Sequence, residues 1–383
     1  MIRGGPLGGI RVIELAGIGP CPFAAMLLAD LGADVLRVDR ASSVVGGGSD
    51  GSSWDLLNRG KRSIGVDLKS PVGAEVVLDL ATRADVLVEG FRPGVAERLG
   101  VGPDACRSRN PALVYGRMTG WGQEGPLAGE VGHDIDYIAL AGVLGQIGRE
   151  GERPLPPINL VGDFGGGGML LAFGVVCALF ERSQSGQGQV VDAAMVDGAA
   201  LLSTMVWSFR SLGVWSDERG TNLLDTGAPF YEVYETADGG HVALGAIEPQ
   251  FYAALLDVLR LDSADLPPQM DRGSWPAVKE RFAEVIRTKG RDEWVQRAEG
   301  TEACLAPVLS MVEASAHPHN VARSTFVELD GRVQPAAAPR FDRSLVPEPG
   351  LPCWPGQGGD EALADWGVTE EAVRTWRATG SLA

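Results

Sequence analysis

The first third of the chain alternates short apolar runs with segments in which apolar residues recur at helical spacing. The apolar runs predict strands at 10–15, 35–38, 86–88 and 113–115, and the periodic segments predict helices at 23–31, 72–81 and 103–109. Strands that alternate with helices at this spacing pair in parallel through crossover connections. The pattern therefore predicts an α/β fold built on a parallel sheet.

The pattern changes along the rest of the chain. We expect a buried apolar helix at 165–180, a short strand at 190–191 and a helix at 193–207. A polar, glycine-punctuated stretch at 211–227 marks a domain boundary. Beyond it lie a predicted hairpin, two helices, a proline-rich segment and a terminal helix, at 230–244, 249–259, 275–287, 334–355 and 369–378. Short strands around an Asp-Gly turn are typical of a smaller α+β domain.

Composition narrows the function. Hydrophobic residues make up 45% and charged residues 22% of the 383 positions, which are values of a globular protein and exclude wholesale disorder. The net charge of −17 excludes an overall basic footprint for nucleic acid. Residues 1–120 nevertheless carry 14 lysines and arginines against 13 acidic residues. We therefore expect any anionic ligand to bind in this first third.

Cysteine and histidine usage favours neither a disulfide framework nor a metal centre. The five cysteines are scattered without a C-x-x-C pair, and the chain has only four histidines. The N-terminus lacks the apolar core of a signal peptide, and the stretch at 165–180 looks too short and too glycine-rich to span a bilayer. We expect a reduced, cytoplasmic protein without a membrane span.

Two segments of the first third suggest ligand contacts. Gly17-x-Gly19-x-x-Pro22 lies between a predicted strand and helix, where it is either a structural turn or an imperfect dinucleotide fingerprint. The basic stretch at 58–63 and the segment at 66–69 suit a polyphosphate ligand, together with Arg37, Arg40, Arg92 and Arg98. The alternative is that these charges form a solvated surface.

Three other segments suggest catalytic chemistry. His133 stands beside two carboxylates, which suits a general base, although a hydrogen-bonded loop histidine gives the same pattern. Asp163 precedes four glycines at a helix start, each costing about 1 kcal/mol of helix propensity. Those glycines indicate either tight helix packing or close approach of a ligand to main-chain N–H groups. Glu248 ends a predicted strand before a proline-initiated helix, where it can also serve the helix dipole.

At these residues the chain resembles the family III CoA-transferases, and within them the α-methylacyl-CoA racemase group. Shared motifs run over nearly the whole length, at 7–15, 31–40, 58–62, 89–94, 117–122, 132–137, 159–165 and 245–252. The resemblance implies an interlocked homodimer whose chains each have a Rossmann-like large domain and a smaller α+β domain. The large domain is expected at 1–205, completed by 325–383, the small one at 225–320, and linkers at 206–224 and 321–340.

The resemblance also implies the site. His133 and Asp163 match an acid/base pair, and Glu248 matches a small-domain carboxylate that supports the histidine of the other subunit. The implied CoA-binding positions are Arg40, Val66, Asp67, Leu68, Lys69, Gly90, Phe91, Arg92, Arg98, Gly132, Asp134, Ile135, Asp136 and Tyr137. A glycine- and serine-rich stretch at 46–53 departs from the family pattern, and we interpret it as a flexible surface loop near the CoA side.

The implied activity is a racemase of lipid metabolism that inverts the α-carbon of 2-methylacyl-CoA thioesters. One residue removes the α-proton and the other returns a proton to the opposite face through an enolate, so no metal, flavin or nicotinamide cofactor is needed. The alternative is a CoA-transferase in which Asp163 attacks as a nucleophile and forms a mixed anhydride. A non-catalytic CoA-binding protein is the third reading. The expected partners are the acyl-CoA substrate and a second copy of the chain.

Overall fold

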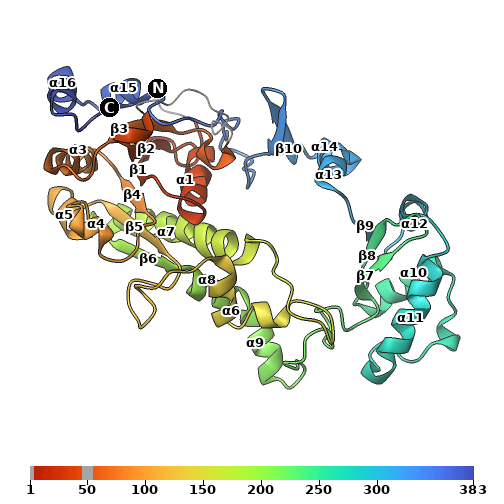
Figure 1. Ribbon diagram of the computed structural model, residues 1–383. Coiled ribbons are helices and arrows are strands. Elements are labelled where there is room, and N and C mark those ends of the chain that lie inside the picture. The colour runs from red at the N-terminus through yellow and green to blue at the C-terminus, as the bar shows by residue number, and fades with distance from the viewer. Residues whose placement is uncertain (1–3, 45–54) are drawn as a thin grey trace. The chain divides into compact units, whose positions relative to one another are not determined.

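The protein is described from a computed structural model, in which residues 4–44 and 55–383 are placed (Figure 1). The expected loop at 46–53 lies outside the described residues. The chain divides into two compact units. Unit 1 comprises Met1–Ala141, Ile158–Leu202 and Ser324–Ala383, and unit 2 comprises Gly142–Pro157 and Ser203–Arg323. The units differ from the expected domains chiefly at Gly142–Pro157, a segment that leaves the large unit and joins the small one.

A six-stranded parallel sheet organises unit 1. Its strands are β1 (Arg11–Leu15), β2 (Asp34–Arg40), β3 (Arg62–Val66), β4 (Val86–Glu89), β5 (Val114–Thr119) and β6 (Val190–Ala194). Their order is β3-β2-β1-β4-β5-β6, and every neighbouring pair is parallel. This is the strand order of the Rossmann fold, in which the topology reverses between β1 and β4. The predicted parallel α/β architecture is confirmed.

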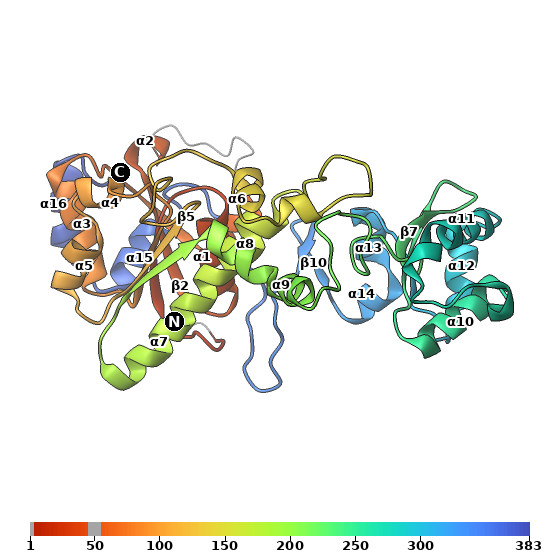
Figure 2. The ribbon, with the colours of Figure 1, turned by 90° about the horizontal axis from the view of Figure 1, so that it is seen from below.

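Helices cover both faces of the sheet because neighbouring residues of each strand point to opposite sides. Ile13 packs into one apolar core and Val12 into the other. The Ile13 side is covered by α3 (Pro71–Ala81), α5 (Pro103–Arg109), α15 (Gly359–Asp365) and α16 (Glu370–Ala378). The Val12 side is covered by α1 (Pro20–Asp30) and α7 (Leu170–Ser185). Figure 1 and Figure 2 both show α3, α5 and α16 together, away from α1 and α7.

The helix expected at 165–180 differs from its prediction. It starts earlier, as the π-helix η4 (Leu160–Met169), and continues as α7. The two form one helix of 26 residues, so the expectation that it is too short to span a bilayer is wrong. Its length and composition would suit a membrane span, but the core helix of a soluble protein passes the same test. The helix is also not fully buried, since Phe173 and Phe180 are exposed.

Strand β3 is an element that the apolar pattern missed. Its neighbourhood is polar in sequence, and the basic stretch at 58–63 was expected to face a ligand. Instead Lys61 and Glu14 form an ion pair at 2.6 Å with both side chains fully buried. Arg59 is likewise buried against Asp30 at 2.5 Å. The ligand-binding interpretation of these two cations is wrong, because their charges are neutralised inside the fold.

The remaining elements of unit 1 are short. They are α2 (Ala41–Val44), α4 (Val95–Arg98), α6 (Asp134–Leu140), α8 (Met195–Leu202), β10 (Phe326–Leu329) and β11 (Arg332–Pro335). The single helix expected at 193–207 is two helices, because α8 ends before Ser203 and α9 (Thr204–Ser211) follows in unit 2.

Unit 2 is a small α+β body, as the hairpin signal predicted. Its antiparallel sheet contains β7 (Tyr231–Glu235), β8 (His241–Gly245) and β9 (Leu305–Pro307) in that order. An aromatic core of Phe230, Tyr252 and Phe282 holds the helices against this sheet. The helices after β7 are α10 (Pro249–Leu259), α11 (Trp275–Ile286), α12 (Arg291–Ala298), α13 (Met311–Ala316) and α14 (Pro318–Ala322).

The Glu14–Lys61 pair generates a stability prediction. Lys61→Met leaves Glu14 buried without a countercharge and also removes the donor to the Pro22 carbonyl oxygen, so the free energy of unfolding should fall by about 3–5 kcal/mol. The double variant Glu14→Leu/Lys61→Met should lose less than the single one, because no uncompensated charge remains. Urea unfolding followed by circular dichroism measures both, with the more exposed Lys279→Met as control. Equal stability of Lys61→Met and wild type would contradict the assignment.

Candidate active site

The first cavity opens where the topology of the sheet reverses. The loops after β1 and β4 leave the sheet in opposite directions, which creates a crevice at the carboxyl ends of the strands. A cavity of about 580 Å³ lies at this point. Its walls are residues that follow β1, β4 and β5, together with His133, Tyr137, Asn159 and Asp163. The two residues expected to form an acid/base pair therefore line the same space.

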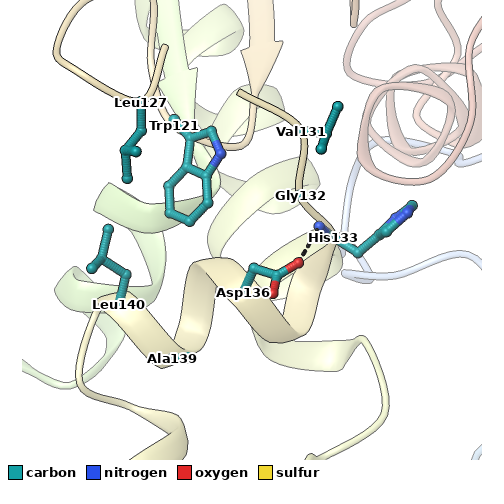
Figure 3. Close-up of a pocket in the computed structure, with 8 residues that line it drawn as sticks. All are labelled: Trp121, Leu127, Val131, Gly132, His133, Asp136, Ala139 and Leu140. Atoms are coloured by element: carbon teal, nitrogen blue, oxygen red, sulfur yellow. Dashed lines mark hydrogen bonds between the residues drawn. The ribbon is translucent and has the colours of Figure 1, made fainter. Parts of the chain in front are cut away.

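His133 reaches the cavity as the N-cap of α6. Its side chain is exposed, and its main-chain N–H donates to Asp136 Oδ2 at 3.0 Å (Figure 3). Figure 3 shows the imidazole extending away from the Asp136 carboxylate. Asp136 thus fixes the main chain of His133, whose side chain lines the cavity.

Asp163 is carried by η4 and is only partly exposed. Its Oδ2 accepts a hydrogen bond from Asn159 Nδ2 at 3.0 Å. Its main-chain N–H donates to Asp134 Oδ1 at 2.7 Å. Sequence reasoning missed Asn159, although a polar residue four positions before an acid on a helix is a detectable signal.

Glycines fix the surroundings of Asp163. Gly19 has a φ of 69°, and a Cβ added there would lie 3.5 Å from Asp163 Oδ2, so the β1–α1 turn runs directly beside the carboxylate. A Cβ at Gly166 would lie 2.6 Å from the main-chain nitrogen of Ala199, and one at Gly168 would lie 2.6 Å from Phe23 Cδ1. The glycines at 165–168 line none of the described cavities. The close contacts of Gly166 with α8 and of Gly168 with α1 favour the tight-packing interpretation of these glycines.

Electrostatics distinguish Asp163 from an ordinary surface carboxyl. Burial raises its pKa, the Asn159 hydrogen bond lowers it, the negative charge of Asp134 raises it, and His133 lowers it. The net result is a raised pKa, so Asp163 keeps its proton to a higher pH than an ordinary aspartate does. Burial together with the charges of Asp163 and Asp136 raises the pKa of Tyr137 to about 12. Tyr137 therefore stays neutral, and its hydroxyl donates to the Gly132 carbonyl oxygen.

A second cavity of about 660 Å³ lies at the ends of β2 and β3. The expected CoA positions Arg40, Val66, Asp67, Leu68, Lys69 and Phe91 line it. Phe91 also lines the first cavity, where Arg92 lies, so the two spaces adjoin. Arg40, Lys69 and Arg92 are exposed and form no ion pair with the described residues. These cations are available to an anion, unlike Arg59 and Lys61.

A third cavity of about 690 Å³ also adjoins the first. Trp121, Val131, Gly132 and His133 line both. The rest of its wall is mostly apolar, formed by Leu127, Ala139 and Leu140 with the carboxylate of Asp136 (Figure 3). His133 therefore stands between a space with mixed polar and apolar walls and a largely apolar one.

The other expected residues are placed less uniformly. Gly90 and Gly132 line the first cavity, whereas Ile135 and Arg98 are exposed and line none of the described cavities. Asp134 is buried and holds Asp163 instead of facing a cavity. Glu248 lies in unit 2, where it is the exposed N-cap of α10. Within the described residues, no group of three or more His, Cys, Asp or Glu side chains is arranged to hold a metal ion.

Comparison with known proteins agrees with this architecture. The family model described as CoA-transferase family III matches residues 7–360. The chain is 48% identical over 370 residues to the α-methylacyl-CoA racemase of Mus musculus, covering 96% of this chain and 95% of the relative. It is 46% identical over 375 residues to the α-methylacyl-CoA racemase of Homo sapiens, with the same coverage.

A solved structure supports the fold alone. A CAIB/BAIF family protein from Brucella suis superposes with a TM-score of 0.81 at 24% identity, covering 95% of this chain and all of the other. The family match spans both units and contains every residue of the three cavities except Gly380. The chain is a member of CoA-transferase family III.

Proposed function

We propose that the protein is an α-methylacyl-CoA racemase that moves a proton between His133 and Asp163 across the α-carbon of the substrate. One observation carries the proposal: both side chains line a single cavity at the switch point of the sheet. The names of the two relatives at 48% and 46% identity support the same reaction. The apolar third cavity supports a substrate with a hydrocarbon tail.

The three adjoining cavities suit the three chemical parts of an acyl-CoA. Arg40 and Lys69 would bind the phosphates of the nucleotide in the second cavity through charge-assisted hydrogen bonds. The pantetheine arm would pass Phe91 into the first cavity, beside Arg92. The thioester would then lie between His133 and Asp163, and the acyl tail would enter the apolar third cavity.

The chemistry requires two groups that exchange roles. For one enantiomer the neutral imidazole of His133 removes the α-proton, and the protonated Asp163 delivers a proton to the opposite face of the enolate. For the other enantiomer the Asp163 carboxylate is the base and the imidazolium is the acid. The raised pKa of Asp163 favours this exchange, because general acid–base catalysis is most effective when the pKa lies near the working pH.

The catalytic pair generates the first functional prediction. His133→Ala and Asp163→Ala should each lower racemisation by roughly 10²–10⁴-fold, because each loses one general acid or base. Each variant should keep slow α-proton exchange with opposite enantiomers, since the remaining group still reaches its own face. Proton NMR in D₂O with each pure enantiomer measures this exchange.

A CoA-transferase gives a different result in the same variants. Asp163→Ala would abolish transfer of CoA to a second carboxylate, His133→Ala would matter little, and hydroxylamine would trap an acyl-Asp163 adduct in the wild type. That combination, without α-proton exchange, would overturn the racemase proposal and leave the CoA site standing.

The free cations generate a binding prediction. Arg40→Ala and Arg92→Ala should raise the Kd for CoA thioesters and leave the melting temperature unchanged, because each removes an exposed cation from a cavity wall and no core packing. The effect should shrink as salt rises, since exposed charges are screened. Isothermal calorimetry at two salt concentrations measures it, with Arg109→Ala, whose side chain pairs with Glu75 away from the cavities, as control. An unchanged Kd at low salt in both variants would remove these arginines from the site.

We also propose that the active form is an interlocked homodimer, in which Glu248 of one chain supports His133 of the other. An apolar stripe on the continuous η4–α7 helix supports a partner, since Met169, Phe173, Val176 and Phe180 are exposed at helical spacing. Such a stripe is costly to leave in water.

The stripe can be tested directly. Phe173→Glu/Phe180→Glu should convert the dimer to a monomer and lower activity, because a charge on each ring position opposes burial. Light scattering after gel filtration without detergent measures the mass, and Leu345→Glu, at an exposed apolar residue that is not part of this helix, is the control. A wild-type protein that is monomeric and fully active would contradict the dimer.

A further inference from the structure

Asp134 is a buried acidic residue that has no role in the proposed reaction as described so far. It is the first residue of α6, only 6% exposed, and it lines none of the three cavities. Its Oδ1 accepts the main-chain N–H of Asp163 at 2.7 Å. Its Oδ2 is buried and has no hydrogen-bond partner among the described residues. A carboxylate that is half unsatisfied inside a protein costs free energy, so packing alone does not account for it.

The hydrogen bond of Asp134 fills a gap in the helix that carries Asp163. The first N–H groups of a helix have no partner inside that helix, and Asp163 is the fourth residue of η4. A carboxylate from a different helix takes this N–H, at the end of the helix where negative charge is favourable. Asp134 therefore fixes η4 at the residue whose side chain faces the cavity.

Gly162 leaves the space that this contact needs. A Cβ at position 162 would lie 2.4 Å from Asp134 Oδ1 and 2.9 Å from its Cγ, so any side chain there would displace the carboxylate. Gly162 is itself buried, and its φ is not in the left-handed region, so its backbone conformation does not demand glycine. Gly162 of η4 thus leaves room for the Asp134 carboxylate of α6 to accept the Asp163 N–H.

We propose that Asp134 is a positioning residue for Asp163, holding the main chain of the proton-transferring residue in place through a buried carboxylate. The inference rests on the proposed function. Asp136 makes the corresponding contact with the other member of the pair, since it accepts the His133 main-chain N–H at 3.0 Å. Carboxylates of one short helix therefore hold the main chains of both proposed catalytic residues.

The charge of Asp134 has a second effect that a purely structural residue would lack. The groups that act on the Asp163 carboxyl are Asn159 on the same helical segment and Asp134 and His133 at the start of α6. Among these only Asp134 raises the pKa of Asp163, in addition to burial. Removing that negative charge should therefore lower the pKa of Asp163, whereas removing the hydrogen bond should misplace the side chain.

Two substitutions separate these effects. Asp134→Asn keeps an Oδ1 acceptor and removes the charge, and Asp134→Ala removes both. In a His133→Ala background, where Asp163 is the remaining base, α-proton exchange rises with pH as Asp163 loses its proton. Asp134→Asn should move the midpoint of this rise to lower pH. Asp134→Ala and Gly162→Ala should slow the exchange by roughly 10- to 100-fold, because small displacements of a catalytic group cost that much.

The Asp163→Ala background shows whether the effect of Asp134 is specific to Asp163. With Asp163→Ala, exchange runs through His133 alone, and Asp134→Ala should slow that rate less than it slows exchange through Asp163. Asp104→Asn, an exposed acid at the start of α5, is the matched control and should change neither rate. Equal slowing in both backgrounds, or an unmoved midpoint in Asp134→Asn, would overturn the positioning role.

A titration that does not depend on activity completes the test. Carbon NMR of protein with ¹³C-labelled aspartate, with the Asp163 signal identified by its loss in Asp163→Asn, reports the pKa of Asp163 in wild type and in Asp134→Asn. A lower pKa in the variant supports the inference, and an unchanged pKa overturns it. A wild type that exchanges neither enantiomer while the pKa still falls would sink the racemase proposal and leave the contact between Asp134 and Asp163 standing.

Discussion

Close packing of η4 on its neighbours is the constraint on which the site depends. A Cβ at Gly198 of α8 would lie 1.9 Å from the carbonyl oxygen of Gly166, so the two backbones touch without any side chain between them. Gly168 makes a similarly close contact with the start of α1. Because η4 is held at this depth, Asp163 lies beside the β1–α1 turn and not in solvent. The four glycines lower the helix propensity of this segment, but they allow the close packing that places the Asp163 carboxyl.

The cations of the first third include a buried, paired group and an exposed group that lines the cavities. The chain has a net charge of −17, yet several cations of its first third are committed to buried pairs such as Glu14–Lys61 and Asp30–Arg59. Arg40, Lys69 and Arg92 form no ion pair with the described residues, and they line the two cavities that adjoin at Phe91. An acidic protein thus keeps a small basic surface at the carboxyl edge of its sheet. A local basic surface on an acidic protein favours the approach of a polyanion at that place.

Much of the fold could be predicted from the sequence because parallel strands buried on both faces appear as apolar runs. Strand β3 escaped because Lys61, Arg62 and Ser63 look solvent-exposed until their partners Glu14, Asp34 and Asp39 are known. Those partners are distant in sequence, so no local pattern reveals them.

The site was also predictable only in part, because local motifs can be recognised in a sequence and long-range contacts cannot. His133 and Asp163 stand in short, unusual motifs, and both line the cavity as expected. The role of Asp134 depends on a contact across 29 positions, and the role of the glycines at 165–168 depends on which helix faces them. Such tertiary contacts decide between packing and ligand binding, and the sequence left both readings open.

The central claim is that one cavity delivers a proton to both faces of the same carbon. The most direct measurement incubates the wild type in D₂O with a single enantiomer of a 2-methylacyl-CoA and follows α-deuterium and stereochemistry together. The account predicts that deuterium enters the α-position and that both enantiomers accumulate, from either starting enantiomer. Transfer of CoA to an added carboxylate with the α-proton and the configuration retained would contradict it.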